Sequence, residues 1–248
     1  MVVIAVSNQK GGVGKTDLSV NLASALAGKK KVVLVDLDPQ SNSTDYLTSK
    51  KPKLSTADLL LNENVSLDDI IQKTEINNLF IAPAHPSLST VQVQLMNDVG
   101  MQFKLKNKLK GHKFDYVIID TQPSLGALTI NALTAADEVL IPLQVHYFAM
   151  DGVANLVNTI KTIKQDINKK LEIGGVVLTM FDKRNRLSFE VEKMVRTTFG
   201  KNVFETTIPI NVKLAEAPSH HKPILLYAPN SRGAKAYQNL AREFVNGR

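Results

Sequence analysis

Short apolar runs of strand length alternate with segments of helical period along the whole chain. Continuous runs of Val, Ile and Leu indicate buried strands of a sheet that is covered on both faces. Leu18, Leu22 and Leu26 recur every fourth residue, and this spacing lines one face of a helix. The predicted strands cover residues 2–6, 32–35, 79–82, 116–119, 139–143 and 176–178.

A second helical pattern runs from Leu156 to Ile167, with apolar residues at steps of four, three and four. Ser66, followed by Asp69, has the spacing of a helix start with an acidic residue at the third helical position. Alternation of strands and helices predicts an α/β fold with a doubly wound, mostly parallel sheet flanked by helices. Because no repeat or linker divides the sequence, we expect a single domain over residues 1–248.

Composition excludes several classes of protein. The chain has no cysteine, which excludes a disulfide framework, a thiolate zinc site, an iron–sulfur cluster and a cysteine nucleophile. Residues 1–7 carry no basic leader, and no apolar run reaches the roughly 18–20 residues of a membrane span. We therefore expect a cytoplasmic protein.

The net charge is +7, from 30 basic and 23 acidic residues. This balance favours a polyanionic partner, either nucleic acid or an acidic membrane surface. A solvated lysine-rich surface explains the charge equally well. Charge alone does not decide the function.

A glycine-rich turn follows the first predicted strand and leads directly into a helical pattern. Glycines let backbone N–H groups approach phosphate oxygens, and the helix N-terminus adds a partial positive charge. Lys15 would reach the outer phosphates and the Thr16 hydroxyl would hold Mg²⁺. A merely flexible turn does not explain the strand, lysine and hydroxyl in this order. The nucleotide-binding residues predicted in this turn are Gln9, Lys10, Gly11, Gly12, Val13, Gly14, Lys15, Thr16 and Asp17.

Two later strands end in carboxylates. Asp36 and Asp38 follow the strand at 32–35, and side chains two residues apart point to the same side of a strand. They lie at the carboxyl edge, where open parallel sheets bind ligands. An Asx turn would explain Asp38-Pro39 but not both acids. Asp120 ends the strand at 116–119 and fits a Walker B carboxylate that holds Mg²⁺.

The glycine-rich turn begins with a second lysine, Lys10, in the run Lys-Gly-Gly-Val-Gly-Lys-Thr. It resembles the loop of the deviant Walker A ATPases, the group that contains ParA/Soj partition proteins, MinD and the nitrogenase iron protein. The resemblance continues through 120–126, 178–182, 208–219 and 233–237. The chain is identified as a member of the ParA/Soj-type chromosome or plasmid partitioning ATPases, over essentially all of its length.

The resemblance implies an ATPase with ATP and Mg²⁺ as cofactors. In that group the first lysine, Lys10 here, crosses to the nucleotide of the other subunit, so that a homodimer encloses two ATP molecules. Asp38 would help to place the attacking water, so the implied catalytic residues are Lys10, Lys15 and Asp38. Asp36 would support the Mg²⁺ shell with Thr16 and Asp120, or pair with a loop lysine. The residues implied to lie near the adenine are Met180, Pro209, Ile210 and Asn211.

Three positions depart from the family pattern. Asp17 stands where ParA-like proteins usually carry a second hydroxyl residue, Gln122 replaces a proline, and His221 replaces a glycine. An acidic residue in the first turn of a helix is favoured by the helix dipole. Beside an anionic phosphate it is disfavoured, so we expect Asp17 to affect nucleotide affinity and hydrolysis.

By the same resemblance, the ATP-bound dimer binds double-stranded DNA without sequence preference, a ParB-like adaptor stimulates hydrolysis, and the protein associates with the nucleoid. Such binding needs only basic side chains that face phosphates. Lys183 and Arg196 are further basic candidates, whereas Lys104, Lys106, Lys108 and Lys110 are interpreted as a solvated surface segment. The main DNA-binding candidates are Arg184, Arg186, Lys213, Lys222, Arg232 and Lys235.

Three other activities compete with DNA segregation. A MinD-like, membrane-associating cell-division regulator would end in a basic amphipathic helix, but residues 241–248 have little apolar face, so no membrane binding is expected. An iron-protein reductase needs cysteines. A metabolic P-loop kinase does not explain Lys10.

Overall fold

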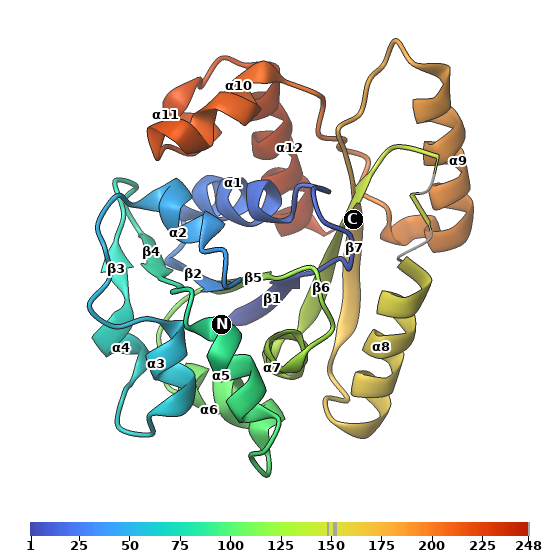
Figure 1. Cartoon of the computed structure of the whole chain (residues 1–248). Coiled ribbons are helices and arrows are strands. Elements are labelled where there is room, and N and C mark those ends of the chain that lie inside the picture. Colours follow the sequence, from blue (N-terminus) through green and yellow to red (C-terminus); the bar gives the residue numbers. More distant parts are fainter. Residues whose placement is uncertain (148, 151–152, 248) are drawn as a thin grey trace.

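The computed structural model describes residues 1–147, 149–150 and 153–247. Arg248, the last residue of the C-terminal segment considered above, lies outside the described residues. The described strands form one sheet in the order β3-β4-β2-β5-β1-β6-β7, and neighbouring strands are parallel except β3 with β4 (Figure 1). The strands are β1 (Val2–Val6), β2 (Val32–Leu37), β3 (Gln72–Lys73), β4 (Leu79–Ala82), β5 (Tyr116–Thr121), β6 (Glu138–Gln144) and β7 (Glu172–Thr179).

Helices occupy most of the segments between the strands. The α-helices are α1 (Lys15–Ala27), α2 (Asn42–Leu47), α3 (Thr56–Leu61), α4 (Leu67–Ile70), α5 (Leu88–Leu95), α6 (Lys104–Leu109), α7 (Ala127–Ala135), α8 (Val153–Asp166), α9 (Arg186–Phe199), α10 (Val212–Glu216), α11 (Ile224–Tyr227) and α12 (Arg232–Asn246). Three short 3₁₀ helices are η1 (Met101–Phe103), η2 (Gly200–Asn202) and η3 (Ala217–His220). Within the described residues, no helix is long and apolar enough to cross a bilayer.

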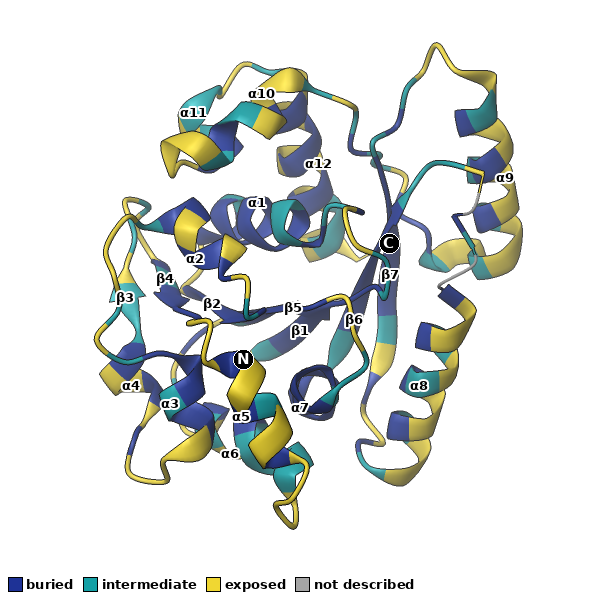
Figure 2. Cartoon of the chain, in the orientation of Figure 1, coloured by how far each residue is buried: buried dark blue, intermediate teal, exposed yellow. Residues whose placement is uncertain are grey.

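The sheet is covered on both faces, as its continuous apolar strands predict. In β1, Ile4 and Val6 pack in a core with α1, α2, α11 and α12. Val3 and Ala5 point to the opposite face and pack in a core that includes α3 and α5 to α9. Figure 1 shows these two helical layers, and Figure 2 shows that the central strands between them are mostly buried, whereas β3 and the start of β7 are not. The predicted α/β fold with a doubly wound, mostly parallel sheet is confirmed.

The strands nearest the phosphate loop extend past their apolar runs. β2 continues to Leu37 and β5 continues to Thr121, so Asp36 and Asp120 lie inside strands. β3 has only two residues and no periodic pattern that would predict it. The predicted helix start at Ser66 is confirmed, because the Asp69 carboxylate accepts hydrogen bonds from the Ser66 N–H and hydroxyl.

The basic segment around α6 is not uniformly solvated. Lys108 donates from Nζ to the carbonyl oxygens of Asn62 and Glu63, at 2.9 Å each, and to that of Val65. These carbonyls belong to the turn that follows α3, from its C-cap Asn62 to Val65. The prediction of a solvated surface is therefore wrong for Lys108, which closes a loop.

Lys104, at the start of α6, forms an ion pair with Asp98 at 2.6 Å.

We expect Lys108→Met to lower the free energy of unfolding by about 1–3 kcal/mol, because three carbonyl acceptors lose a charged donor. Urea denaturation of the two proteins measures the difference. Lys106→Met is the matched control on the same helix, since Lys106 has no hydrogen-bond partner among the described residues. An equal effect of both substitutions would show that Lys108 does not hold the loop.

Candidate functional site

The phosphate loop joins β1 to α1 and leaves its backbone N–H groups accessible. Gly14 precedes α1 with φ +85°, and Gly12 has φ +73°, a conformation that residues with a Cβ rarely adopt. A Cβ on Gly11 or Gly12 would meet no atom within 4 Å. No side chain caps the N-terminus of α1. The loop therefore forms an open cradle of N–H groups at a helix N-terminus, which suits an anion.

Lys15 is held above this cradle. Its Nζ donates to the Lys10 carbonyl oxygen at 2.9 Å, and only 7% of the residue is exposed. Burial lowers the pKa of Lys15, whereas the nearby carboxylates of Asp120 and Asp38 raise it. The ammonium of Lys15 therefore lies on the phosphate loop and near two carboxylates. A phosphate bound in the loop would be within reach of this ammonium.

Lys10 extends away from its own cradle. Its Nζ contacts Nε2 of His146, which follows β6, and its backbone N–H donates to the Asn8 side chain at 3.1 Å. Asn8 is fixed in turn by a hydrogen bond to the Pro142 carbonyl oxygen at 2.7 Å. Asn8 thus holds the backbone of Lys10, while the Lys10 ammonium contacts a residue outside the phosphate loop.

Asp120 is the centre of a buried cluster of hydroxyl groups. Its carboxylate accepts hydrogen bonds from Thr16 at 3.0 Å, from Ser19 at 2.9 Å and from Ser43 at 2.6 Å. The residue is fully buried. Burial raises the pKa of Asp120, and these three hydrogen bonds lower it. Asp120 and the Thr16 hydroxyl of the phosphate loop are therefore in contact, and their predicted role in holding Mg²⁺ stays a prediction.

Asp36 lies beside Asp120 on the neighbouring strand, because the two are paired in the register of β2 and β5. It accepts hydrogen bonds from the Asp38 N–H at 3.1 Å, and from the N–H and hydroxyl of Thr44 at 2.9 and 2.7 Å. Burial, and then the charge of Asp120, raises the pKa of Asp36 to about 8. Asp36 thereby holds the start of α2, and its predicted metal role stays a prediction.

The residues around Asp120 suit Mg²⁺. Mg²⁺ prefers oxygen ligands and is commonly held by one or two protein groups together with substrate phosphates. Thr16 and Asp120 offer such oxygens beside the cradle. Within the described part of the chain, no three acidic or histidine side chains group closely enough to hold a metal by themselves. The arrangement fits an ion that is shared with phosphates.

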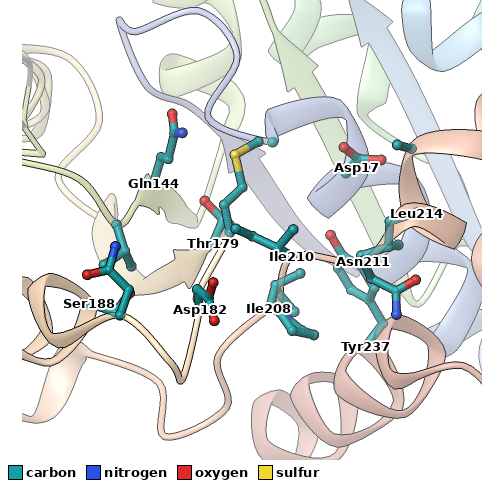
Figure 3. Close-up of a pocket in the computed structure, with 16 residues that line it drawn as sticks. Asp17, Gln144, Thr179, Asp182, Ser188, Ile208, Ile210, Asn211, Leu214 and Tyr237 are labelled. Atoms are coloured by element: carbon teal, nitrogen blue, oxygen red, sulfur yellow. The ribbon is translucent and has the colours of Figure 1, made fainter.

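A cavity of about 390 Å³ opens beside the cradle (Figure 3). One wall comes from the end of β7, where Met180 adopts φ +53°. The chain holds this strained residue in place, because Phe181 N–H donates to the Ile208 carbonyl at 2.9 Å and Ile210 N–H donates to the Phe181 carbonyl at 3.3 Å. The predicted residues that line the cavity are Gly14, Asp17, Met180, Pro209, Ile210 and Asn211.

Asp17 lies in the wall of this cavity, in the first turn of α1. Its Oδ1 is shielded from solvent and has no hydrogen-bond partner among the described residues. Burial raises the pKa of Asp17 to about 6, although a hydrogen bond with Tyr46 lowers it. The structure thus places an acidic group in the wall of the predicted nucleotide pocket.

Sequence reasoning missed several residues of the site. Ser19 lies three residues after Thr16, and this helical spacing could have placed both hydroxyls on one face of α1. No sequence signal points to Ser43. Tyr237, a buried residue of α12 that lines the cavity, lies in the stretch 233–237 that resembles the family, but sequence analysis assigned it no role at the site. Their positions depend on how α2 and α12 pack on α1.

Basic residues line a second hollow of about 1050 Å³, which shares Asp182, Pro209 and Ile210 with the cavity. We call this hollow the basic groove, and its basic residues are Lys183, Arg184, Arg232 and Lys235. Within the groove, Arg184 forms an ion pair with Asp182 at 2.9 Å. The other DNA-binding candidates lie outside the groove and also form ion pairs: Arg186 with Glu190, Lys213 with Glu216, and Lys222 with Glu75.

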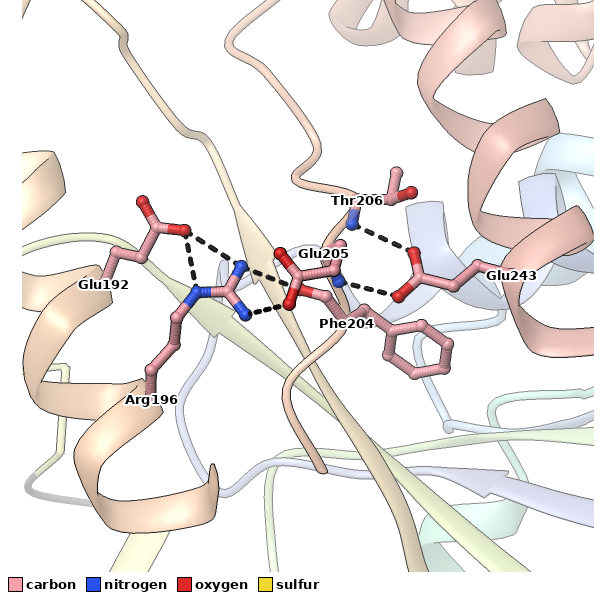
Figure 4. A network of polar contacts seen from close by, with 6 residues as sticks. All are labelled: Glu192, Arg196, Phe204, Glu205, Thr206 and Glu243. Atoms are coloured by element: carbon pink, nitrogen blue, oxygen red, sulfur yellow. Dashed lines mark hydrogen bonds and ion pairs between the residues drawn. The ribbon is translucent and has the colours of Figure 1, made fainter. Parts of the chain in front are cut away.

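Arg196 belongs to a network that ties α9 to α12 (Figure 4). It donates to Glu192 at 3.0 Å and to Glu205 at 2.9 Å. The Glu243 carboxylate of α12 accepts the N–H groups of Glu205 and Thr206 at 2.7 and 3.0 Å. The network fixes the segment that leads into the cavity wall, so Arg196 has a structural role there.

The sequence was compared with known protein families and with characterised proteins. Residues 1–173 match a family described as an AAA domain. The chain is 46% identical to the sporulation initiation inhibitor protein Soj of Bacillus subtilis, over 97% of both chains. It is 43% identical to the chromosome partitioning protein ParA of Myxococcus xanthus, over 98% of this chain and 87% of that protein.

A solved structure has the same fold. It is the cobyrinic acid a,c-diamide synthase of Mycobacterium smegmatis with a bound ATP analogue and magnesium, at 33% identity and a TM-score of 0.86. The match covers 100% of this chain and 97% of that one. A nucleotide and magnesium therefore occupy a protein of this fold.

Proposed function

We propose that this chain, which belongs to the Soj/ParA family of chromosome-partitioning ATPases, hydrolyses ATP with Mg²⁺ and uses ATP-driven dimerisation to switch on DNA binding. One observation carries the proposal. The nucleotide cavity and the basic groove share the wall formed by Pro209 and Ile210. A nucleotide that moves this wall would change the shape of the cavity and of the basic groove together.

The phosphate loop would bind the triphosphate through its N–H groups, and Lys15 would neutralise the outer phosphates. Thr16 and Asp120 would hold Mg²⁺, which supplies positive charge to the phosphate oxygens when it is bound. Asp38, only 7% exposed, would orient the attacking water. Lys10 would act on the nucleotide of the second subunit, in the manner of an arginine finger supplied in trans.

The basic groove supports non-specific DNA binding. Arg232 and Lys235 are exposed and form no ion pair within the described part of the chain. Free basic side chains can contact phosphates without reading bases. In a dimer, two grooves would act on one duplex and their contacts would add. A ParB-like adaptor would stimulate hydrolysis and release the DNA, so that the protein cycles on the nucleoid.

ATP is expected to convert weak DNA binding into strong binding that ignores sequence. Filter binding on two unrelated duplexes, with ADP, ATP and a non-hydrolysable analogue across a salt series, measures the switch. Binding should weaken steeply with salt, with a logarithmic slope of about 0.9 for each phosphate neutralised. Lys235→Ala removes one basic residue from each groove. It should reduce the slope by about 1 for each phosphate contact that is lost, and it should leave ATP binding unchanged.

Lys170→Ala removes the same charge from the exposed connection between α8 and β7, and is the matched control. It should leave the slope unchanged. Equal DNA binding with ADP and ATP would contradict the proposed switch. Co-sedimentation with anionic vesicles in place of DNA would instead support the MinD-like membrane regulator.

A further inference from the structure

His221 ends η3 in a backbone conformation that favours glycine. Its φ is +52° and its ψ is +33°, in the left-handed region, and its N–H donates to the Pro218 carbonyl oxygen at 3.0 Å. A residue in this conformation closes the C-terminus of many helices, and a side chain with a Cβ is disfavoured there. The family pattern has glycine at this position, whereas this chain carries an imidazole. The histidine therefore costs free energy in the backbone, and any benefit has to come from its side chain.

The imidazole of His221 joins two segments that are far apart in the sequence. Its Nδ1 contacts the carbonyl oxygen of Asp45 in α2, where η3 packs against that helix. A carbonyl oxygen only accepts, so Nδ1 carries a proton and donates. Because α2 ends at Leu47, the Asp45 carbonyl is one of the last acceptors of the helix, which have no intrahelical partner. His221 therefore supplies a donor that the helix itself lacks.

A run of backbone hydrogen bonds leads from this contact to Asp38. The Asp45 N–H donates to the Ser41 carbonyl oxygen at 2.9 Å, and the Ser41 N–H donates to the Asp38 carbonyl oxygen at 2.9 Å. The Asp38 side chain closes the same turn, because its Oδ1 accepts the Gln40 N–H at 2.9 Å. Asp38 is thus linked to Asp45 through consecutive peptide groups, and a contact that fixes Asp45 limits the motion of Asp38.

The first turn of α2 depends on contacts with other segments. Ser41 begins the helix with φ +56°, and its side chain makes no capping hydrogen bond. Its buried Oγ has no partner among the described residues. A helix of six residues is not stable by itself. Ser43 and Thr44 hold the helix to the buried carboxylates of β5 and β2, and His221 holds it to η3.

We propose that His221 is a positioning residue for ATP hydrolysis, which keeps Asp38 in place through α2. The inference rests on the proposed role of Asp38 in orienting the attacking water. His221 is not among the described residues that line the nucleotide cavity, so it acts on the hydrolytic step and not on nucleotide affinity. Because the family pattern has glycine here, the contact raises the rate of a reaction that does not require it.

Steady-state hydrolysis of ATP and calorimetry with ADP test the inference on the variant His221→Gly. This variant removes the imidazole and suits the left-handed backbone, so it should fold, which thermal unfolding checks. We expect kcat to fall about three- to tenfold, the effect of losing one hydrogen bond, with KM for ATP and the dissociation constant for ADP unchanged. Amide exchange at Ser41 and Asp45 should become faster. His220→Ala is the matched control, since this neighbouring imidazole stacks on Tyr227 of α11, and it should leave kcat unchanged.

A double-mutant cycle with Asp38→Ala shows whether His221 acts through Asp38. Single-turnover measurements with excess protein reach the low rates of Asp38→Ala, and in that background His221→Gly should have no further effect. The same three- to tenfold loss in both backgrounds would overturn the inference. So would a parental kcat in His221→Gly, an equal loss in His220→Ala, or a loss of ADP affinity in place of kcat. Parental hydrolysis by Asp38→Ala would instead refute the proposed role of Asp38 itself.

Discussion

Lys15→Ala is expected to raise the dissociation constant for ATP by more than about 100-fold. Lys15 is the cation that the structure holds over the phosphate cradle, with its Nζ 2.9 Å from the Lys10 carbonyl oxygen. A hydrogen bond between a charged donor and a phosphate is stronger than a neutral one, and burial strengthens it further. Loss of about 3 kcal/mol corresponds to roughly two factors of ten in affinity. Calorimetry with ATP and Mg²⁺ measures the change.

Lys29→Ala is the matched control for this prediction. It removes the same charge just past the C-terminal end of α1, where the residue is exposed. It should leave ATP affinity unchanged. Thermal unfolding of both variants would show whether either substitution disturbs the fold. Parental ATP affinity in a folded Lys15→Ala protein would refute the phosphate-loop assignment.

Lys10→Ala and Asp38→Ala are expected to stop the cycle at different stages. The Lys10 ammonium contacts His146, and Lys10 is proposed to act on the nucleotide of the second subunit, so the loss of Lys10 should spare ATP binding but prevent ATP-driven dimerisation. Asp38 is buried next to Lys15 and Asp120, and its loss should lower hydrolysis by at least about 100-fold while the ATP dimer persists.

Size-exclusion chromatography with light scattering, with ATP and Mg²⁺, separates the two variants. Lys10→Ala should elute as a monomer and Asp38→Ala as a long-lived dimer. A Lys10→Ala protein that dimerises and hydrolyses ATP at the parental rate would rule out the trans-acting lysine. A monomeric Asp38→Ala protein would show that Asp38 supports dimerisation instead of water placement.

Local sequence determined most of what lies along single elements of this protein. The apolar runs located β1 and β4 to the residue, because a strand buried on both faces must be apolar throughout. The order of strand, glycines, lysine and hydroxyl located the phosphate loop, since only that order aims N–H groups, an ammonium and a hydroxyl at one anion. The carboxylates at 36 and 120 followed from their positions at the ends of apolar runs.

Tertiary packing decided which of these groups meet and which partners they have. Ser43 contacts Asp120 across 77 residues, because parallel pairing of β2 and β5 brings the ends of these strands to one edge of the sheet. Lys108 became a loop-closing residue only because α6 packs near the end of α3. The sequence by itself therefore determined the chemical groups and their elements. Only the tertiary structure decided that Asp17 has a buried oxygen without a donor, since that depends on how α1, α2 and α12 enclose it.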